Sequence, residues 1–524
     1  MRSFVVALAA TLSPAAALAC GGMFCNNTQP INQSAERILF ARSGDQIEMH
    51  VQISYQGPPQ DFGWILPTPA DVETTLSSEN LFRQLDANFT PQFQLIQEFD
   101  DGCLPPPQAG GFDNAEDGGS PSGGRGVDVL SREAIGPFDR VILNADNVAA
   151  LREWLTENSF QIPEGTDETL APYIELGAVF VAVRLLPGAD AGDIAPLRLT
   201  FSAALPSIPI RPTAVATEPD MGMIVHLLGP ARGIPNNYRH LQINEAAIDW
   251  ISGGQNYADV VSQAADEANG KGFVTDFAGP HQGALDAALA PIGDDQIEQL
   301  AAAATLGEAV AALRDLTDAD IQRLLSDFYT VPDGVSPTQY FQCPDCFGEP
   351  VDQSQAVDGA ALAARVQSEI NPARVALTAL FGAQPYLTRL YTTLSAEEMD
   401  LDPEFSFNVD LGDQPRTRTA TQHFHCGEDG NIGDSDLTLA NGLTFALVGG
   451  AVPDAVQRQA GETVRGMEVP AAAVIEQMME AGQPIVIEDR TDAITARYNG
   501  GDPGAGGQPG AGGQPGAGGE PGAD

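Results

Sequence analysis

The sequence predicts an α+β fold in which mostly antiparallel sheets carry helical insertions and disulfide bonds brace the chain. Short stretches of alternating apolar and polar residues, bounded by turn residues, are typical of half-buried strands. Amphipathic stretches of helical length interrupt these runs of strands, which favours α+β over a parallel α/β sheet. Six cysteines supply an even set for disulfide bonds.

The first predicted elements are a β-hairpin and a third strand. The stretch RILFA (37–41), the turn RSGD and the stretch QIEMHVQISY (46–55) follow one another. The period of two in the last stretch and the Ser-Gly-Asp turn before it indicate a hairpin. His50 falls on the face opposite the apolar residues, where we expect an exposed histidine rather than a ligand. The stretch DFGWILPTP (61–69) predicts a third strand that ends at its two prolines.

Further elements follow along the chain. We expect helices at 77–89, 148–158, 257–268 and 471–481, and an Ala-rich helical zone at 285–329. We expect strands at 127–130, 178–186, 197–203, 221–228, 386–394 and 443–448. Within the helical zone, Thr317 is the expected N-cap of the helix DADIQRLLSDFY.

The chain divides into six predicted segments. They are a signal peptide at 1–19, an N-terminal β-rich region at 20–103, a Pro/Gly-rich acidic linker or loop at 104–126, a central α+β region at 127–350, a C-terminal α+β region at 351–499 and a Gly/Pro-rich tail at 500–524. The tail has Gly at every third position, as collagen does. Its alternate GAG triplets lack proline, so we expect a flexible, unpaired tail and a monomeric protein.

The leader predicts export. Arg2 precedes an apolar run, and Ala17-Leu18-Ala19 places small residues at the −3 and −1 positions before Cys20. This order favours cleavage by ordinary signal peptidase over lipid attachment at Cys20. We therefore expect a periplasmic or extracellular protein. No later stretch is long enough to span a bilayer, which needs about 20 apolar residues.

Charge and motif content exclude several classes of function. The formal net charge is −46 and Lys271 is the only lysine, so the phosphate backbone of a nucleic acid would be repelled. The GxSxG, HExxH, P-loop and strand-linked GxGxxG motifs are all absent from the sequence. The leading prediction is a non-enzymatic exported protein without a cofactor, which interacts with an unknown envelope or extracellular partner.

The cysteines favour disulfide bonds, because an exported chain meets an oxidising compartment. They are Cys20, Cys25, Cys103, Cys343, Cys346 and Cys426. Since short loops close most readily, we expect the local pairs Cys20–Cys25 and Cys343–Cys346. Elimination then leaves Cys103 with Cys426.

The main alternative is an envelope protein that binds a metal. The motifs CPDC and HFHC together offer Cys343, Cys346, His423 and His425 as zinc ligands. If HFHC is extended, its two histidines share one face while Cys426 points to the other. The acidic stretch EDGNIGDSD (428–436) suits calcium by composition, but it lacks the EF-hand order and favours a polar turn. A hydrolase with an unfamiliar site is the second alternative.

The stretch SAEE (395–398) resembles a pair of catalytic carboxylates, but a capping box between Ser395 and Glu398 accounts for it. Arg389 precedes it in a strand-like stretch. We expect Arg389 to pair with one of these acids and to stabilise the fold rather than to bind substrate.

Several motifs in one order resemble a known group of proteins. They are CGGMFC, DFGWILPTP, AADEANGKGFVTDFAG, YFQCPDCF and PYLTRLYTTLSAEEMDLDPEF. The chain is similar, from Cys20 to about Phe405, to an uncharacterised family of exported bacterial proteins that is classified as a domain of unknown function. The resemblance implies a bacterial envelope or secreted protein and assigns no catalytic residues.

Overall fold

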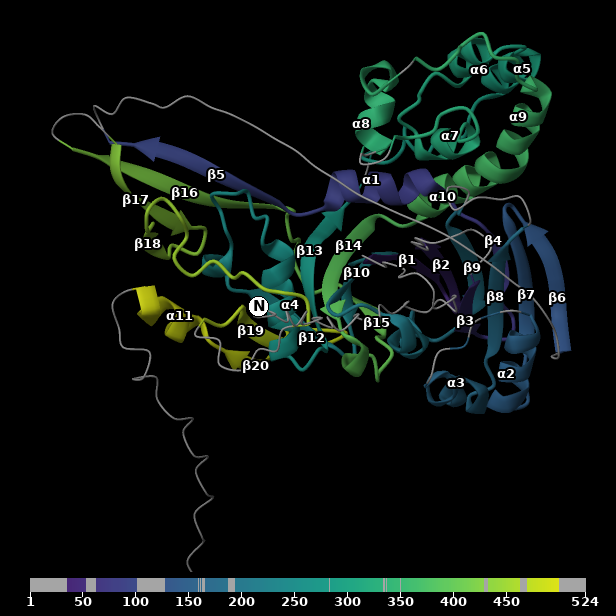
Figure 1. The fold of residues 1–524 in the computed structure, drawn as a ribbon. Helices are drawn as coiled ribbons and strands as arrows, with labels where there is room; N and C mark the ends of the chain where they lie inside the picture. Colours follow the sequence, from purple (N-terminus) through teal and green to yellow (C-terminus); the bar gives the residue numbers. More distant parts are fainter. Residues whose placement is uncertain are drawn as a thin grey trace, which may run out of the picture.

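The computed structural model describes most of the chain between residues 35 and 498 (Figure 1). The described residues are 35–52, 63–100, 128–158, 160, 162, 165–186, 194–281, 283–332, 335, 337–348, 350–427, 432–461 and 469–498. The predicted signal peptide, linker and tail lie outside these residues, as do Cys20, Cys25 and Cys103. What the sequence predicts of them stays a prediction.

A ten-stranded sheet forms the centre of the molecule. Its strands are β1 (Ala35–Ser43), β2 (Gln46–Gln52), β4 (Glu73–Leu76), β9 (Leu197–Ser202), β10 (Met221–Gly229), β12 (Arg239–Ile243), β13 (Gly272–Pro280), β14 (Tyr386–Leu394), β19 (Ala472–Gln477) and β20 (Ile485–Asp489). Their order is β20-β19-β12-β13-β14-β10-β1-β2-β9-β4. Two neighbouring pairs, β1/β10 and β12/β13, are parallel and the others are antiparallel, which confirms the predicted α+β fold class.

A four-stranded sheet packs against the part of the large sheet that contains β10, β1, β2 and β9. It has the order β3-β8-β7-β6 and contains β3 (Gly63–Thr68), β6 (Asp128–Ile135), β7 (Phe138–Asn144) and β8 (Val179–Leu185). Phe40 and Val225 of the large sheet share one buried core with Trp64 and Val181 of the smaller one. The other face of the smaller sheet packs against α2 (Val148–Glu157) and α3 (Thr166–Glu175).

A second four-stranded sheet packs against the other part of the large sheet, which contains β12, β13 and β19. It has the order β18-β17-β16-β5 and contains β5 (Gln92–Phe99), β16 (Thr417–Cys426), β17 (Ile432–Leu439) and β18 (Thr444–Ala446). It shares a core with α4 (Tyr257–Glu267), α11 (Thr491–Tyr498) and strands β12, β13 and β19. In Figure 1, β5, β16 and β17 extend from this core as a long ribbon. A two-stranded sheet pairs β11 (Arg232–Pro235) with β15 (Phe405–Asn408).

The helical lobe, residues 292–370, has a core of its own. It contains α5 (Asp294–Ala302), α6 (Leu306–Leu313), α7 (Ala319–Leu324), α8 (Pro337–Gln342) and α9 (Gly359–Arg365), and a π-helical turn (Val366–Ile370) connects it to α10 (Asn371–Ala383). Figure 1 shows the lobe above α1 (Glu79–Phe89) and α10. Short 3-10 turns are at Arg211–Ala216, Glu245–Ala247, Pro344–Cys346 and Ala396–Glu398.

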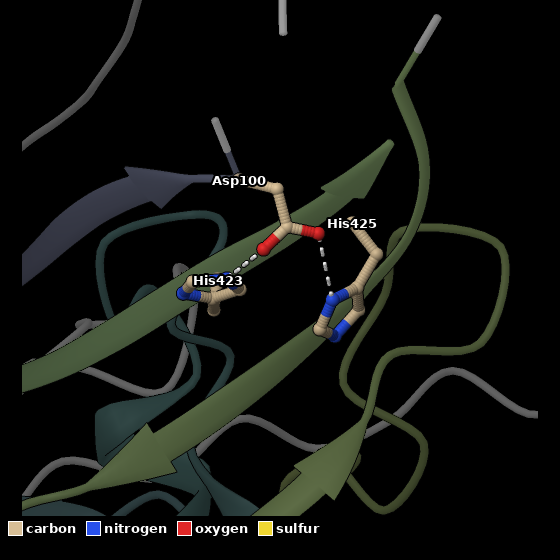
Figure 2. A group of neighbouring side chains, drawn as sticks. All are labelled: Asp100, His423 and His425. Carbon is tan, nitrogen blue, oxygen red and sulfur yellow. Dashed lines mark hydrogen bonds and ion pairs between the residues drawn. The ribbon is translucent and has the colours of Figure 1, made fainter. Parts of the chain in front are cut away.

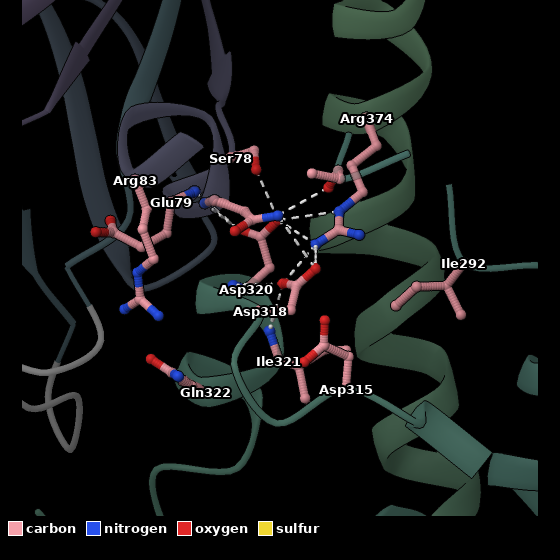
Figure 3. A network of polar contacts seen from close by, with 12 residues as sticks. Ser78, Glu79, Arg83, Ile292, Asp315, Asp318, Asp320, Ile321, Gln322 and Arg374 are labelled. Atoms are coloured by element: carbon pink, nitrogen blue, oxygen red, sulfur yellow. Dashed lines mark hydrogen bonds and ion pairs between the residues drawn. The ribbon is translucent and has the colours of Figure 1, made fainter. Parts of the chain in front are cut away.

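A buried polar network joins the helical lobe to α1 (Figure 3). The Arg374 guanidinium of α10 contacts the carboxylates of Asp318 at 2.6 Å and Asp320 at 2.8 Å, and all three side chains are at least 90% buried. Asp320 also accepts a hydrogen bond from the Ser78 hydroxyl at 2.6 Å and one from the Glu79 backbone N–H at 2.7 Å. One carboxylate therefore serves both the lobe and the first turn of α1.

The predicted hairpin of β1 and β2 is confirmed, but the prediction for His50 is wrong. Only 1% of the His50 surface is exposed. Its ring nitrogens contact the Ser77 hydroxyl at 2.6 Å and the Glu48 carboxylate at 3.0 Å. The face that the strand pattern marks as polar is covered by the segment that leads into α1, and hydrogen bonds satisfy the buried imidazole.

Two further predictions need correction. The helix expected at 471–481 is instead the strand β19, which pairs with β12 on one side and β20 on the other. Sheet pairing on both edges overrides the helical preference of its Ala and Glu residues. The N-cap of α7 is Asp318 rather than Thr317, because the Asp318 carboxylate accepts from the N–H groups of Asp320 and Ile321 at 3.0 and 3.2 Å.

We expect the stability of the folded protein to depend on pH through the buried Glu36 of β1. It is 7% exposed, and burial raises the pKa of its carboxyl from 4.5 to about 7. A carboxyl whose pKa is higher in the folded state supports folding while it is protonated, so this support is lost as pH rises from about 4.5 to 7. We expect Glu36→Gln to raise the free energy of unfolding at pH 8 by about 2 to 3 kcal/mol and to change it little at pH 4.5. Urea unfolding at pH 8 and at pH 4.5 measures the free energy of unfolding of both proteins. An equal effect of Glu36→Gln at the two pH values would contradict the prediction.

Candidate metal centre

The strands β5, β16 and β17 bring together two histidines and an aspartate. The parallel register of β5 with β16 places His423 beside Glu98, and the antiparallel register with β17 places it opposite Asp436. Asp100 directly follows β5, and its backbone N–H donates to the Phe424 carbonyl at 3.1 Å. Because Asp100 extends the pairing by one residue, its carboxylate lies against the end of β16.

The stretch HFHC is extended, since it ends β16. His423 and His425 therefore project from one face of the sheet, and Figure 2 shows the Asp100 carboxylate between their rings. His423 Nε2 lies 2.8 Å from Asp100 Oδ1, and His425 Nδ1 lies 3.4 Å from Asp100 Oδ2.

Two more carboxylates flank this cluster. Asp436 Oδ2 lies 3.0 Å from His425 Nε2, and Glu98 Oε2 lies 3.7 Å from His423 Nδ1. The hydrogen bond with Asp436, aided by Asp100, raises the pKa of His425. The hydrogen bond with His423 lowers the pKa of Asp100. Asp100, His423 and His425 together therefore favour a bound positive charge, which is either a proton or a metal ion.

Asp100, His423 and His425 have the spacing of a set of metal ligands. Each offers one ligand atom, and these atoms all lie within 4.8 Å of one another. Within the described part of the chain, no other set of three His, Cys, Asp or Glu residues meets this spacing. The side chains are 37 to 47% exposed, so an ion from solvent reaches them directly.

Aromatic packing on the opposite face holds the two ligand-bearing strands together. Phe99 and Phe424 stack with ring centroids 4.8 Å apart and an interplanar angle of 11°. Because side chains alternate along a strand, this pair lies behind the residues that carry the ligands. Cross-strand aromatic pairs stabilise sheets, so the separation between Asp100 and the histidines is supported by packing as well as by backbone pairing.

The four-ligand zinc site that CPDC and HFHC offered as an alternative is not assembled. Cys343 and Cys346 are joined to one another by the predicted local disulfide, with Cα atoms 5.4 Å apart. They belong to the helical lobe and are not part of the ligand group of His423 and His425. The spacing between motifs does not reveal that one lies in the lobe and the other on a distant sheet.

Cys426 also takes part in a disulfide bond, and its partner is not among the described residues. Asp100 pairs with Phe424 through a backbone hydrogen bond. Cys103 lies three positions after Asp100, and Cys426 lies two positions after Phe424. We therefore expect the predicted bond between Cys103 and Cys426. Peptide mapping without reduction measures this, and a link from Cys426 to Cys20 or Cys25 would contradict it.

The other candidate residues named from the sequence are those of the acidic stretch 428–436, the stretch SAEE and Arg389, and none of them belongs to the ligand group. Glu428 and Asp429 of the acidic stretch lie outside the described residues. The capping box of Ser395 and Glu398 is present, with the Glu398 carboxylate accepting from the Ser395 N–H at 2.8 Å. Arg389 pairs with the buried Asp276 of β13 and not with an acid of SAEE, so that pairing prediction is wrong.

Asp100 is the ligand that sequence reasoning missed. It follows β5, which the sequence analysis did not assign as a strand, and it meets His423 across 323 positions of sequence. Parallel strands are not joined by a short turn, so no turn motif in the sequence predicts a pairing at this separation. The available signal was the alternation in QFQLIQEF (92–99), which is weak because most of its residues are exposed.

The chain is thus an α+β protein with an imidazole–carboxylate cluster on an outer sheet. The model of a family described as an uncharacterized protein conserved in bacteria, DUF2330, matches residues 14–303, which is more than half of the chain. The chain belongs to this family. The match includes Asp100 and ends before the CPDC motif and both histidines. No curated protein and no solved structure matches the chain.

No helix in the described parts of the chain combines the length and apolar character that crossing a membrane requires.

Proposed function

We propose that this chain is an exported, non-enzymatic bacterial protein that binds one divalent transition-metal ion, with zinc as the best match, at Asp100, His423 and His425. The observation that carries the proposal is the convergence of two imidazoles and one carboxylate with ligand atoms within 4.8 Å. Zinc takes imidazole and carboxylate ligands, and its open sites commonly have three protein ligands. Calcium and magnesium prefer oxygen ligands alone, so the two histidines favour zinc over them.

The surroundings of the cluster support the binding of a cation by an exported protein. Glu98 and Asp436 add negative charge next to the ligands, and the chain as a whole carries a formal charge of −46. The predicted signal peptide and the Cys343–Cys346 disulfide support export, because disulfides persist in oxidising compartments. Three protein ligands leave a position for water or for a group of the envelope or extracellular partner.

Calorimetric titration of the chelator-treated full chain with zinc tests the proposal. Because a strongly acidic surface collects cations without specificity, the titration is carried out at about 0.15 M salt with excess magnesium. We expect one saturable zinc site per chain that magnesium does not displace. Zinc binding that magnesium removes completely would refute the proposal.

A further inference from the structure

A cleft of about 720 Å³ lies between the large sheet and the sheet that carries the metal centre. Its lining comes from β11, β12, β13, β16 and β19, from α11 and from the loops beside them. None of the residues of the metal centre lines it. Sites for small molecules typically occupy about 300 to 1,000 Å³, so the cleft has the size of a binding site.

Arg232 supplies a positive charge to this cleft, and the Glu476 and Asp413 carboxylates act on it only from beyond ion-pair distance. Its Nη1 donates to the Gly412 carbonyl at 3.1 Å, while its Nε is buried without a hydrogen-bond partner. Among the described residues, no carboxylate lies within ion-pair distance of it, although the chain has 71 acidic and 25 basic residues. By contrast, Arg418 in the same cleft pairs with Glu245 at 3.3 Å.

Burial makes this charge costly, and it lowers the pKa of Arg232. A half-buried guanidinium with no carboxylate partner is stabilised by an anion that enters the cleft. The planar fork of arginine matches a carboxylate with two parallel hydrogen bonds. The charge and the geometry therefore favour a ligand that carries a carboxylate.

The other charged groups of the lining already have partners, and the remaining groups offer hydrogen bonds. Glu245 pairs with Arg418, and Glu476 contacts His240 and accepts a hydrogen bond from Gln242. His240 contacts Glu476 at 3.2 Å and the Thr275 hydroxyl at 3.0 Å, and burial lowers the pKa of this imidazole so that it is neutral at neutral pH. Amide and hydroxyl side chains such as Gln242 and Asn441 add donors and acceptors. Groups of this kind match the hydroxyls of a polar ligand.

We propose that this cleft binds a small polyhydroxylated carboxylic acid of the sugar-acid class. Its carboxylate pairs with Arg232, and its hydroxyls bond to the neutral polar groups of the lining. A neutral sugar would leave the guanidinium unpaired, and an apolar acid would leave the amide and hydroxyl groups unsatisfied. The proposal is independent of metal binding, because the two sites share no residue.

Calorimetric titration of the full chain with glucuronate tests this inference. We expect saturable binding of glucuronate, no measurable binding of glucose and weaker binding of inorganic phosphate. Arg232→Gln should weaken glucuronate binding by about tenfold or more, since it removes a charge-assisted pair. The matched variant Arg152→Gln removes an exposed arginine of α2 and should leave the affinity unchanged.

Three results would overturn the inference: no saturable binding of glucuronate by the wild type, equal binding of glucose, or equal binding of phosphate. Because Arg232 has no ion pair to lose, Arg232→Gln should unfold in urea with a midpoint close to that of the wild type. Arg232→Lys keeps the charge without the fork and should have intermediate affinity. The variant His425→Ala should still bind glucuronate, which separates this inference from the metal proposal.

Discussion

Arg374→Met is expected to lower the free energy of unfolding by about 3 to 5 kcal/mol. The variant removes the cation that contacts Asp318 at 2.6 Å and Asp320 at 2.8 Å and leaves both carboxylates buried. Breaking a buried pair by removing one partner is costly because the remaining charge has neither water nor a counter-ion. Since Asp320 also bonds to Ser78, the attachment of the helical lobe to α1 should weaken first.

Urea unfolding followed by two probes, far-UV circular dichroism and limited proteolysis of the lobe, measures the effect. The matched control is Arg365→Met, which removes a partly buried pair while Glu369 keeps its pair with Arg323, and it should change stability by less than about 1 kcal/mol. A loss for Arg374→Met no greater than that of the control would show that the network contributes little.

His425→Ala is expected to weaken zinc binding by at least about 100-fold. This ring stands between Asp100 at 3.4 Å and Asp436 at 3.0 Å, so its loss removes one ligand and the contact that orients a neighbouring carboxylate. Loss of an outer-shell partner alone typically costs about 10- to 100-fold in metal affinity, and loss of a ligand should cost more. Asp100→Asn should have a similarly large effect, because the amide does not carry the negative charge.

The control for charge is Asp434→Asn. Asp434 is an exposed residue of β17 outside the ligand group, and its replacement removes the same unit of charge as Asp100→Asn. We expect the zinc affinity of Asp434→Asn to stay within about threefold of the wild-type affinity, because exposed charges interact weakly at physiological salt. Similar losses for Asp434→Asn and Asp100→Asn in competition titrations would indicate diffuse attraction to an acidic surface.

Local patterns predicted a substantial part of the fold. The hairpin of β1 and β2, the helix α1 and the local disulfide Cys343–Cys346 depend on residues that are close in sequence, and all three are confirmed. The shared face of His423 and His425 follows from the period of two in a strand once HFHC is extended, as it is in β16. Each of these features has a physical cause within one short stretch of the sequence.

The errors arose where distant segments decide the outcome. His50 is buried because the segment before α1 covers a strand face that its own sequence marks as polar. The stretch that became β19 has helix-forming residues, but β12 and β20 satisfy its backbone on both sides. Tertiary pairing of this kind overrides local propensity and has no signature in the segment itself.

Two residues of the candidate site, His423 and His425, were named from the sequence only within the metal-binding alternative. That alternative joined them to Cys343 and Cys346, because thiolate and imidazole are ligand types that zinc takes. The carboxylate that completes the group comes from the parallel neighbour β5, 323 positions away. Charge made the choice harder, since Asp100 is one of 71 acidic residues and nothing local distinguishes it from the others.

The most direct test of the metal proposal is an anomalous-difference map from crystals of the full chain prepared with zinc, with data collected on both sides of the zinc absorption edge. We predict one strong peak about 2.0 to 2.2 Å from a carboxylate oxygen of Asp100 and from one ring nitrogen each of His423 and His425. No peak at this position, or peaks held only by surface carboxylates elsewhere, would contradict the proposal.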